Sequence, residues 1–167
     1  MEMAFETERL ELHVFDDKHI EYVKQFWGDE EVMKLCDGAT SHEVLFKVIA
    51  AYRTCHEVNR LSVYAVKEKE TGEIIGAAGF NITGAISEVE LIYHFSKNSW
   101  GKGFATEAAL ACIELAKNHG KVQLVTASAS PENIGSLKIL ENIGFIFKEM
   151  KWFDDTEQEE PYYEFTV

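Results

Sequence analysis

The feature that most constrains this chain is a strand, a glycine turn and a helix in direct succession. An apolar run at residues 89–95 (VELIYHF) has the composition of a strand, and residues 109–116 (ALACIELA) have that of a helix. Between them, Gly101 and Gly103 allow positive φ angles and let a ligand come close to the backbone. The free N–H groups and the positive dipole end of the helix face the same place. Together these features predict an anion site, most often one for phosphate.

The spacing of the glycines narrows the kind of phosphate site. A Walker-type loop has four residues between its glycines and then Lys-Ser or Lys-Thr, a pattern that this turn lacks. A dinucleotide-binding fingerprint would require Gly or Ala where the chain has Thr106. A lone Gly-x-Gly turn is more often a plain helix start with flexible glycines, so the rest of the chain has to decide.

Size and composition favour one globular domain, residues 1–167, because 46% of the residues are hydrophobic and only two are proline. The chain has no apolar run of about 20 residues and no basic-then-apolar N-terminus, so we expect no membrane partner, no secretion signal and a cytoplasmic location. The three widely spaced cysteines favour reduced thiols over disulfides, and we expect no metal site.

The formal charge of −13 argues against nucleic acid as a partner, because such binding requires clustered Lys and Arg. The charge is compatible with a cationic substrate that is steered by negative potential. Acidity that serves only solubility explains the charge equally well, so charge does not identify the substrate.

Hydrophobic periodicity assigns the first half of the chain to one strand and several helices. Asp16 is the expected N-cap of the first long helix. The segment TSHE at residues 40–43 has the spacing of a capping box for the second. The expected strand covers residues 5–15, and the expected helical segments cover residues 17–27, 30–35 and 40–58.

The second half is expected to be mostly strand, with one helix after the glycine turn and a shorter one that ends at Gly144. The element order β-α-α-β-β-β-α-β-α-β-β predicts an α+β fold. We expect a mixed, mostly antiparallel sheet with helices on both faces and one parallel step across the helix after the glycine turn. The expected strands cover residues 61–67, 73–82, 90–95, 122–127, 145–153 and 162–166, the shorter helix covers residues 133–141, and an acidic loop covers residues 154–160.

Three segments in a fixed order carry a family resemblance that spans nearly the whole chain. They are TERLEL at residues 7–12, WGKGFATEA at residues 100–108, and NIGS at residues 133–136, followed by Glu141 and the Gly-Phe pair at 144–145. Together they resemble the GNAT superfamily of acyl-CoA N-acyltransferases, and within it the ribosomal-protein-alanine/serine acetyltransferase type (RimJ/RimL-like). The resemblance implies a GNAT-like fold, acetyl-CoA as co-substrate, and direct acetyl transfer in a ternary complex to a primary amine. The amine would belong to a protein N-terminus or a small molecule, and a homodimer is a family-level expectation.

The chain departs from the family pattern at three positions. Asn98 stands where the superfamily loop usually begins with Gln or Arg, and His13 stands where the opening strand often has Arg. Leu140 aligns with the tyrosine that serves many members as general acid. We therefore do not expect the tyrosine variant of the mechanism.

Acetyl transfer to an amine requires a base, because the pKa is about 10.4 for lysine and about 8 for an α-amino group. Glu90 lies on the strand that leads to the glycine turn and is the candidate base, although a solvated strand carboxylate would look the same. His94 is the alternative base, because alternation places it on the same strand face as Glu90. The resemblance implies that Ser136 would hydrogen-bond or protonate the departing sulfur, although a small polar residue at this position fits an ordinary surface equally well.

The resemblance also implies which residues hold the cofactor. Backbone N–H groups near residues 93–95 would meet the oxyanion and the pantetheine arm, and the glycine turn would bind the pyrophosphate. Asn133 would hold the pantetheine amide, although it could equally be a plain N-cap. The expected cofactor-binding residues are Tyr93, His94, Phe95, Trp100, Gly101, Lys102, Gly103, Phe104, Ala105, Thr106, Asn133 and Ser136.

These residues are compatible with two functions of different classes. One is an acetyl-CoA-dependent N-acetyltransferase, and the other is a non-catalytic acyl-CoA-binding sensor or regulatory domain. The pair Glu90 and Ser136 favours the enzyme, because a pure binder requires neither side chain. The sequence does not identify the amine acceptor.

Overall fold

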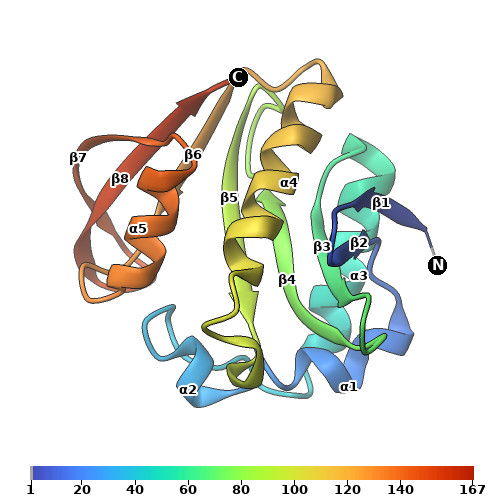
Figure 1. The fold of residues 1–167 in the computed structure, drawn as a ribbon. Helices are drawn as coiled ribbons and strands as arrows, with labels where there is room; N and C mark the ends of the chain where they lie inside the picture. Colours follow the sequence, from blue (N-terminus) through green and yellow to red (C-terminus); the bar gives the residue numbers. More distant parts are fainter. Residues whose placement is uncertain (1) are drawn as a thin grey trace.

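Eight strands form one mixed sheet, in the order β1-β2-β3-β4-β5-β6-β8-β7, in a computed structural model that describes residues 2–167 (Figure 1). In these residues, no helix has both the length and the apolar character that a membrane span requires. The strands are β1 (Met3–Glu6), β2 (Leu10–His13), β3 (Val63–Glu68), β4 (Ile74–Asn81), β5 (Glu88–Phe95), β6 (Leu124–Ser128), β7 (Ile146–Phe153) and β8 (Gln158–Thr166). The helices are η1 (Asp17–His19), α1 (Ile20–Val23), α2 (Glu30–Met33), α3 (Leu45–Asn59), η2 (Lys97–Ser99), α4 (Phe104–His119) and α5 (Ile134–Asn142).

The pairing of β5 with β6 is the only parallel step that the described strands make, and α4 connects the two strands. The predicted parallel crossover is therefore confirmed. The pairing covers only Glu88–Glu90 of β5, so the remainder of that strand has no described strand beside it on this side. In Figure 1 the two strands lie together near the C-terminus and separate toward the end of the sheet where α2 lies. The sheet therefore opens beyond Glu90.

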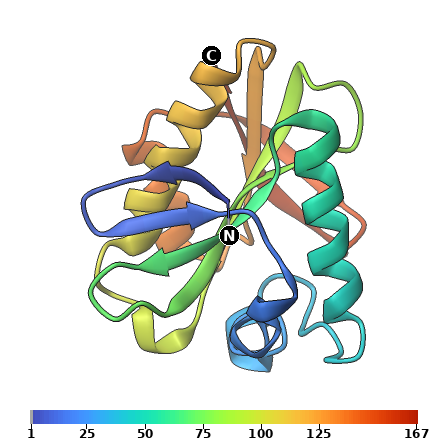
Figure 2. The ribbon, with the colours of Figure 1, turned by 90° about the vertical axis from the view of Figure 1, so that its right-hand side faces the viewer.

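Helices cover both faces of the sheet, as the sequence predicts (Figure 2). Along β5 the side chains alternate between these faces, because successive residues of a strand point to opposite sides. Leu91 and Phe95 pack in the cluster that contains α4, and Ile92 packs against the cluster that contains α1 and α3. Small buried residues on α4 allow the helix to lie close to the sheet, and they are Ala108, Ala109, Ala111 and Ala116.

The first predicted strand, residues 5–15, is two strands in the structure. The chain turns back at Thr7, whose N–H donates to the Leu10 carbonyl at 2.8 Å, while the Leu10 N–H donates to Thr7 Oγ1 at 3.0 Å. The turn contains no Gly, Pro, Asn or Asp, so the usual sequence signals for a turn are missing. The predicted core face is confirmed, because Leu10, Leu12 and Val14 all lie in one buried cluster.

The two early helices are shorter than predicted. Asp16 caps η1 as expected, but residues 24–28 form turns that allow Phe26 and Trp27 both to be buried. The capping box predicted at residues 40–43 is wrong, because α3 begins later and its N-cap makes no side-chain hydrogen bond. His42 is used elsewhere, since its Nε2 lies 3.1 Å from the carbonyl oxygen of Gly28.

The C-terminal elements follow the prediction with one correction. Gly144 ends α5 at φ +106°, and the Phe145 N–H donates to the Leu140 carbonyl, which is the Schellman pattern expected of a C′ glycine. The acidic loop predicted at residues 154–160 is partly strand, because β8 begins at Gln158. Glu160 Oε2 accepts hydrogen bonds from Thr156 Oγ1 and Gln158 Nε2, both at 2.9 Å, which tie the loop to the start of β8.

Gly79 provides a stability test of the central sheet. Its φ is +154°, and a Cβ added there would overlap the carbonyl oxygen of Ser62 and lie 2.6 Å from Val63 Cα. We expect Gly79→Ala to lower the free energy of unfolding by about 2–4 kcal/mol, measured by urea denaturation. Gly84→Ala is the matched control, because a Cβ there meets nothing within 4 Å, and it should stay within about 0.5 kcal/mol of wild type. Equal stabilities of the two variants would contradict the prediction.

Candidate active site

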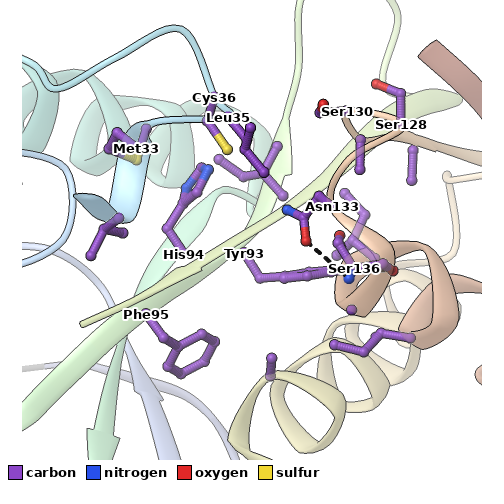
Figure 3. Close-up of a pocket in the computed structure, with 18 of the residues that line it drawn as sticks. Met33, Leu35, Cys36, Tyr93, His94, Phe95, Ser128, Ser130, Asn133 and Ser136 are labelled. Atoms are coloured by element: carbon purple, nitrogen blue, oxygen red, sulfur yellow. Dashed lines mark hydrogen bonds between the residues drawn. The ribbon is translucent and has the colours of Figure 1, made fainter. Parts of the chain in front are cut away.

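A cavity of about 930 Å³ lies where β5 and β6 separate (Figure 3). Glu90 and Ser136, the two predicted catalytic residues, both line it, although they are 46 positions apart in the sequence. Every predicted cofactor-binding residue except Lys102 also lines it. Lys102 lies instead at a smaller depression beside Arg9 and Lys69, so its contact with the cofactor stays a prediction.

The glycine turn presents free N–H groups to this cavity. Gly101 and Gly103 have φ angles of +76° and +81°, and Gly103 is the N-cap of α4. Within the described chain, the N–H groups of Gly101 and of residues 103–106 donate no hydrogen bond to a protein acceptor. A Cβ at Gly101 would meet nothing within 4 Å, so a ligand can approach the backbone there. This turn therefore fits an anionic group such as a pyrophosphate.

The early segment 7–12 holds the glycine turn in place. The Glu107 carboxylate at the start of α4 accepts hydrogen bonds from Thr7 Oγ1 at 2.6 Å, Arg9 N at 2.9 Å and Arg9 Nε at 2.7 Å. Arg9 also donates from Nη1 to the Lys102 carbonyl at 2.9 Å. Burial alone would raise the pKa of Glu107, but the hydrogen bonds from Thr7 and Arg9 outweigh it and lower the pKa.

The free edge of β5 directs two backbone N–H groups into the cavity. The Ser96 N–H donates to the Ile75 carbonyl, which continues the hydrogen-bond ladder between β5 and β4. This bond shows that the N–H groups of even-numbered residues of β5 face β4. Because the direction alternates along an antiparallel strand, the N–H groups of Tyr93 and Phe95 face the open side. The backbone N–H of His94 faces β4, so only its side chain reaches the cavity.

Glu90 is the end of a short polar chain on the α3 side of the sheet. Its Oε1 accepts from Asn81 Nδ2 at 3.3 Å, and Asn81 Oδ1 accepts from the Tyr52 hydroxyl at 3.1 Å. Burial raises the pKa of Glu90, the Asn81 hydrogen bond opposes this, and the nearby Asp155 and Glu160 raise it further. A carboxylate with a raised pKa is a better proton acceptor, which suits a general base.

His94 is held as a neutral imidazole by Trp27. The Trp27 indole N–H donates to His94 Nδ1 at 3.1 Å, so the ring hydrogen must be on Nε2. Burial lowers the pKa of His94 to about 4. Figure 3 shows the ring directed away from Tyr93, toward Met33 and Cys36. Because the basic lone pair of His94 already accepts a hydrogen bond, this geometry favours Glu90 as the base.

Ser136 and Asn133 meet β5 from the start of α5. Asn133 is the N-cap, since its Oδ1 accepts from the Ser136 N–H at 3.2 Å, and its Nδ2 has no protein partner among residues 2–167. The Ser136 Oγ lies 2.9 Å from the Tyr93 hydroxyl. Leu140 is buried in the core and offers no hydroxyl.

Sequence reasoning missed the contacts that three side chains make at this site. Alternation along the strand places the Tyr93 ring opposite Glu90, but no pattern indicates that its hydroxyl reaches α5. Asn81 carries one weak signal, a polar residue at the end of an apolar strand. Trp27 has the spacing of a core residue, and it is both buried and part of the cavity wall.

Comparisons with known proteins agree with this architecture. A family model described as "Acetyltransferase (GNAT) domain" matches residues 9–146. An uncharacterized N-acetyltransferase, p20 of Bacillus licheniformis, is 32% identical over 145 residues, which cover 83% of this chain and 80% of p20. Another uncharacterized N-acetyltransferase, YjdG of Bacillus subtilis, is 28% identical to this chain over 155 residues, which cover 86% of this chain and 90% of YjdG.

Solved structures share the fold. A GNAT-family acetyltransferase from Bacillus anthracis has a TM-score of 0.84 at 23% identity, with 96% of each chain covered. RimL, a ribosomal L7/L12 α-N-protein acetyltransferase in complex with coenzyme A, has a TM-score of 0.85 at 16% identity, with coverages of 99% and 98%.

Glu107 tests the link between segment 7–12 and the glycine turn. We expect Glu107→Gln to lower the free energy of unfolding at neutral pH by about 1–2 kcal/mol, because charge-assisted hydrogen bonds from Arg9 are lost. Since its pKa is lower in the folded state, the stabilisation is present at neutral pH and disappears as the pH falls through that pKa. Chemical denaturation at neutral pH, and again below the ordinary pKa of 4.5, measures this.

The matched control is Glu114→Gln on the same helix, where an exposed pair with Lys117 at 3.6 Å should contribute less than about 0.5 kcal/mol. A stability loss in Glu107→Gln that stayed constant into acid would contradict a role for the ionised carboxylate.

Proposed function

The chain belongs to the GNAT acetyltransferase family, and from this premise we propose that it transfers the acetyl group of acetyl-CoA to a primary amine. The observation that carries the proposal is one cavity that contains a phosphate-type glycine turn, a carboxylate with a raised pKa and a serine hydroxyl. Acetyl-CoA supplies the acetyl group as a thioester. The protein binds it, positions it and provides the groups that accept and donate hydrogen bonds.

The cofactor-binding half rests on backbone groups. The N–H groups of residues 101–106 would hold the pyrophosphate, with the Thr106 hydroxyl available beside them. The open edge of β5 can pair with the pantetheine amides, and the free Nδ2 of Asn133 can donate to the same arm. Among residues 2–167, the Asn133 Nδ2 and the Tyr93 and Phe95 N–H groups have no protein acceptor, so binding there does not have to break an existing hydrogen bond.

Two N–H groups are placed for the oxyanion that forms when the amine attacks the thioester. Those of Tyr93 and Phe95 face the cavity from a strand that β4 holds rigidly on its other side. Preorganised donors of this kind stabilise developing negative charge, and removal of one costs about a hundredfold or more in rate.

Glu90 would remove the proton from the attacking amine, directly or through a water molecule. The raised pKa of Glu90 lies nearer to the pKa of the amine, and the hydrogen bond from Asn81 fixes the orientation of the carboxylate. Asp155 and Glu160 line the same cavity, so a protonated amine would enter a negative environment. Ser136 would hydrogen-bond the departing sulfur.

Direct transfer in a ternary complex fits better than a covalent enzyme intermediate. Cys36 is the cysteine that lines the cavity, but burial together with nearby Glu160 and Asp155 raises the pKa of its thiol. A protonated thiol is a poor nucleophile. The cavity therefore supports attack by the amine itself.

A protein N-terminus and a small amine both fit as acceptors. The solved neighbours RimL and a ribosomal-protein-S5-alanine acetyltransferase from Vibrio fischeri act on protein N-termini or protein alanine by their names, and at 16% and 17% identity they share the fold with this chain. Thermal-shift and turnover assays with acetyl-CoA over a panel of N-terminal peptides and small amines test the proposal. Binding of acetyl-CoA without turnover across the panel would favour a non-catalytic sensor.

Glu90→Gln tests the base. We expect kcat/KM to fall by a factor of about 10²–10⁴, because the amide cannot accept the proton. In wild type, kcat/KM should fall at acidic pH with an apparent pKa above the ordinary Glu value of 4.5. This fall should disappear in the variant. Glu88→Gln is the matched control, since Glu88 is exposed on the same strand and lies outside the cavity lining. Full activity of Glu90→Gln would remove Glu90 as the base.

A further inference from the structure

Tyr93 makes a contact that the proposed mechanism does not use. Its ring leaves β5 on the face opposite Glu90 and extends toward the start of α5, as Figure 3 shows. The hydroxyl lies 2.9 Å from Ser136 Oγ and 3.2 Å from the Ser136 carbonyl oxygen. Both residues line the cavity. One phenol proton therefore has two acceptors within reach on the same residue.

The choice between these acceptors decides where the Ser136 proton can point. If the phenol of Tyr93 donates to the Ser136 carbonyl, the Ser136 hydroxyl donates to the phenol oxygen. The Ser136 proton is then engaged and cannot point toward a ligand. If the phenol donates to Oγ, the serine proton is free. The 2.9 Å contact between the two hydroxyls serves both arrangements, so the carbonyl contact decides between them. Its 3.2 Å lies beyond the usual O–H···O range, which favours the second arrangement. The carbonyl is also the acceptor of an ordinary helical hydrogen bond in α5.

We infer that Tyr93 is a positioning residue, whose phenol donates to Ser136 Oγ and thereby turns the Ser136 proton toward the sulfur of coenzyme A. The inference rests on the proposed function, in which Ser136 faces that sulfur. The phenol of Tyr93 does not touch the reacting atoms itself, whereas the backbone N–H of the same residue is one of the two proposed oxyanion donors. It acts through Ser136, so the two hydroxyls work in series.

The pKa values of these groups decide whether the departing sulfur receives a proton or only a hydrogen bond. Burial raises the pKa of Tyr93 to about 12, which keeps its proton in place at neutral pH. A thiol has an ordinary pKa of about 8.5, roughly three units lower. The thiolate is therefore the weaker base, and no proton leaves the hydroxyl pair. Ser136 stabilises the thiolate by a hydrogen bond, and Tyr93 keeps that bond in the right direction.

The pKa of the thiol of bound coenzyme A tests this series arrangement without any amine acceptor. It is measured in the binary complex from the ultraviolet absorbance of the thiolate as the pH is raised. We expect this pKa to rise by about one unit in Tyr93→Phe and in Ser136→Ala, because the thiolate loses a directed hydrogen bond. In the Ser136→Ala background, Tyr93→Phe should add nothing, since the two groups act in series.

Tyr163→Phe is the matched control. The Tyr163 hydroxyl on β8 donates to Glu141 of α5, the helix that carries Ser136, at 3.1 Å, and Tyr163 lies outside the cavity lining. A general loosening of α5 would change the thiol pKa in this variant as well, whereas the inferred role leaves it at the wild-type value.

An unchanged thiol pKa in a Tyr93→Phe protein that still binds coenzyme A would overturn the inference. A further shift in the double variant would also overturn it. Should Tyr93→Phe fail to fold, a fluorinated tyrosine at position 93 keeps the packing and makes the phenol a stronger donor. It should lower the thiol pKa, and no change would count against the inference. A wild-type protein that does not bind coenzyme A would overturn the proposed function together with this inference. The other outcomes are observed in proteins that bind coenzyme A, so they concern this inference alone.

Discussion

Only residues Glu88–Glu90 hold β5 against β6, and beyond them a sheet that is otherwise continuous opens. The cavity, the two unpaired N–H groups of β5 and the approach of α5 to Tyr93 all follow from this separation. The opening does not divide the hydrophobic core, because α4 and residues such as Ala127 and Leu140 continue one buried cluster behind it. The protein can therefore leave backbone groups unpaired at the site without losing the packing that supports them.

Two glutamates show how the same side chain takes opposite roles. Glu107 receives three hydrogen bonds from Thr7 and Arg9, and its pKa is lowered, so it remains a fixed anion that shapes the glycine turn. Glu90 receives one hydrogen bond from the neutral amide of Asn81, and burial raises its pKa. The difference lies in the number and charge of the donors, because burial opposes ionisation in both cases. One carboxylate serves structure, and the other is available to take up a proton.

Local patterns in the sequence predicted the strand, glycine turn and helix, and the parallel step across α4. The family resemblance implied the cofactor-binding residues, of which all but Lys102 line the cavity. What they could not predict includes a turn without the usual turn residues and several contacts between residues distant in the sequence. The turn after β1 is closed by Thr7 rather than by a glycine, and His42 bonds to Gly28 instead of opening α3. The Trp27 bond that fixes the His94 tautomer joins residues 67 positions apart. Such contacts are set by tertiary packing, which periodicity does not encode.

The bond between Arg9 and Glu107 spans 98 positions, and it has a consequence for the order in which the molecule assembles. Strand, turn and helix from residue 88 to residue 119 are local in the sequence and can form early, whereas a contact of such separation closes a long loop and forms late. The phosphate-type turn therefore reaches its final shape only when the β1–β2 hairpin has added to the sheet edge. We therefore expect the glycine turn to reach its final shape and the N-terminal hairpin to be completed in one folding event, although the two segments lie in opposite halves of the chain.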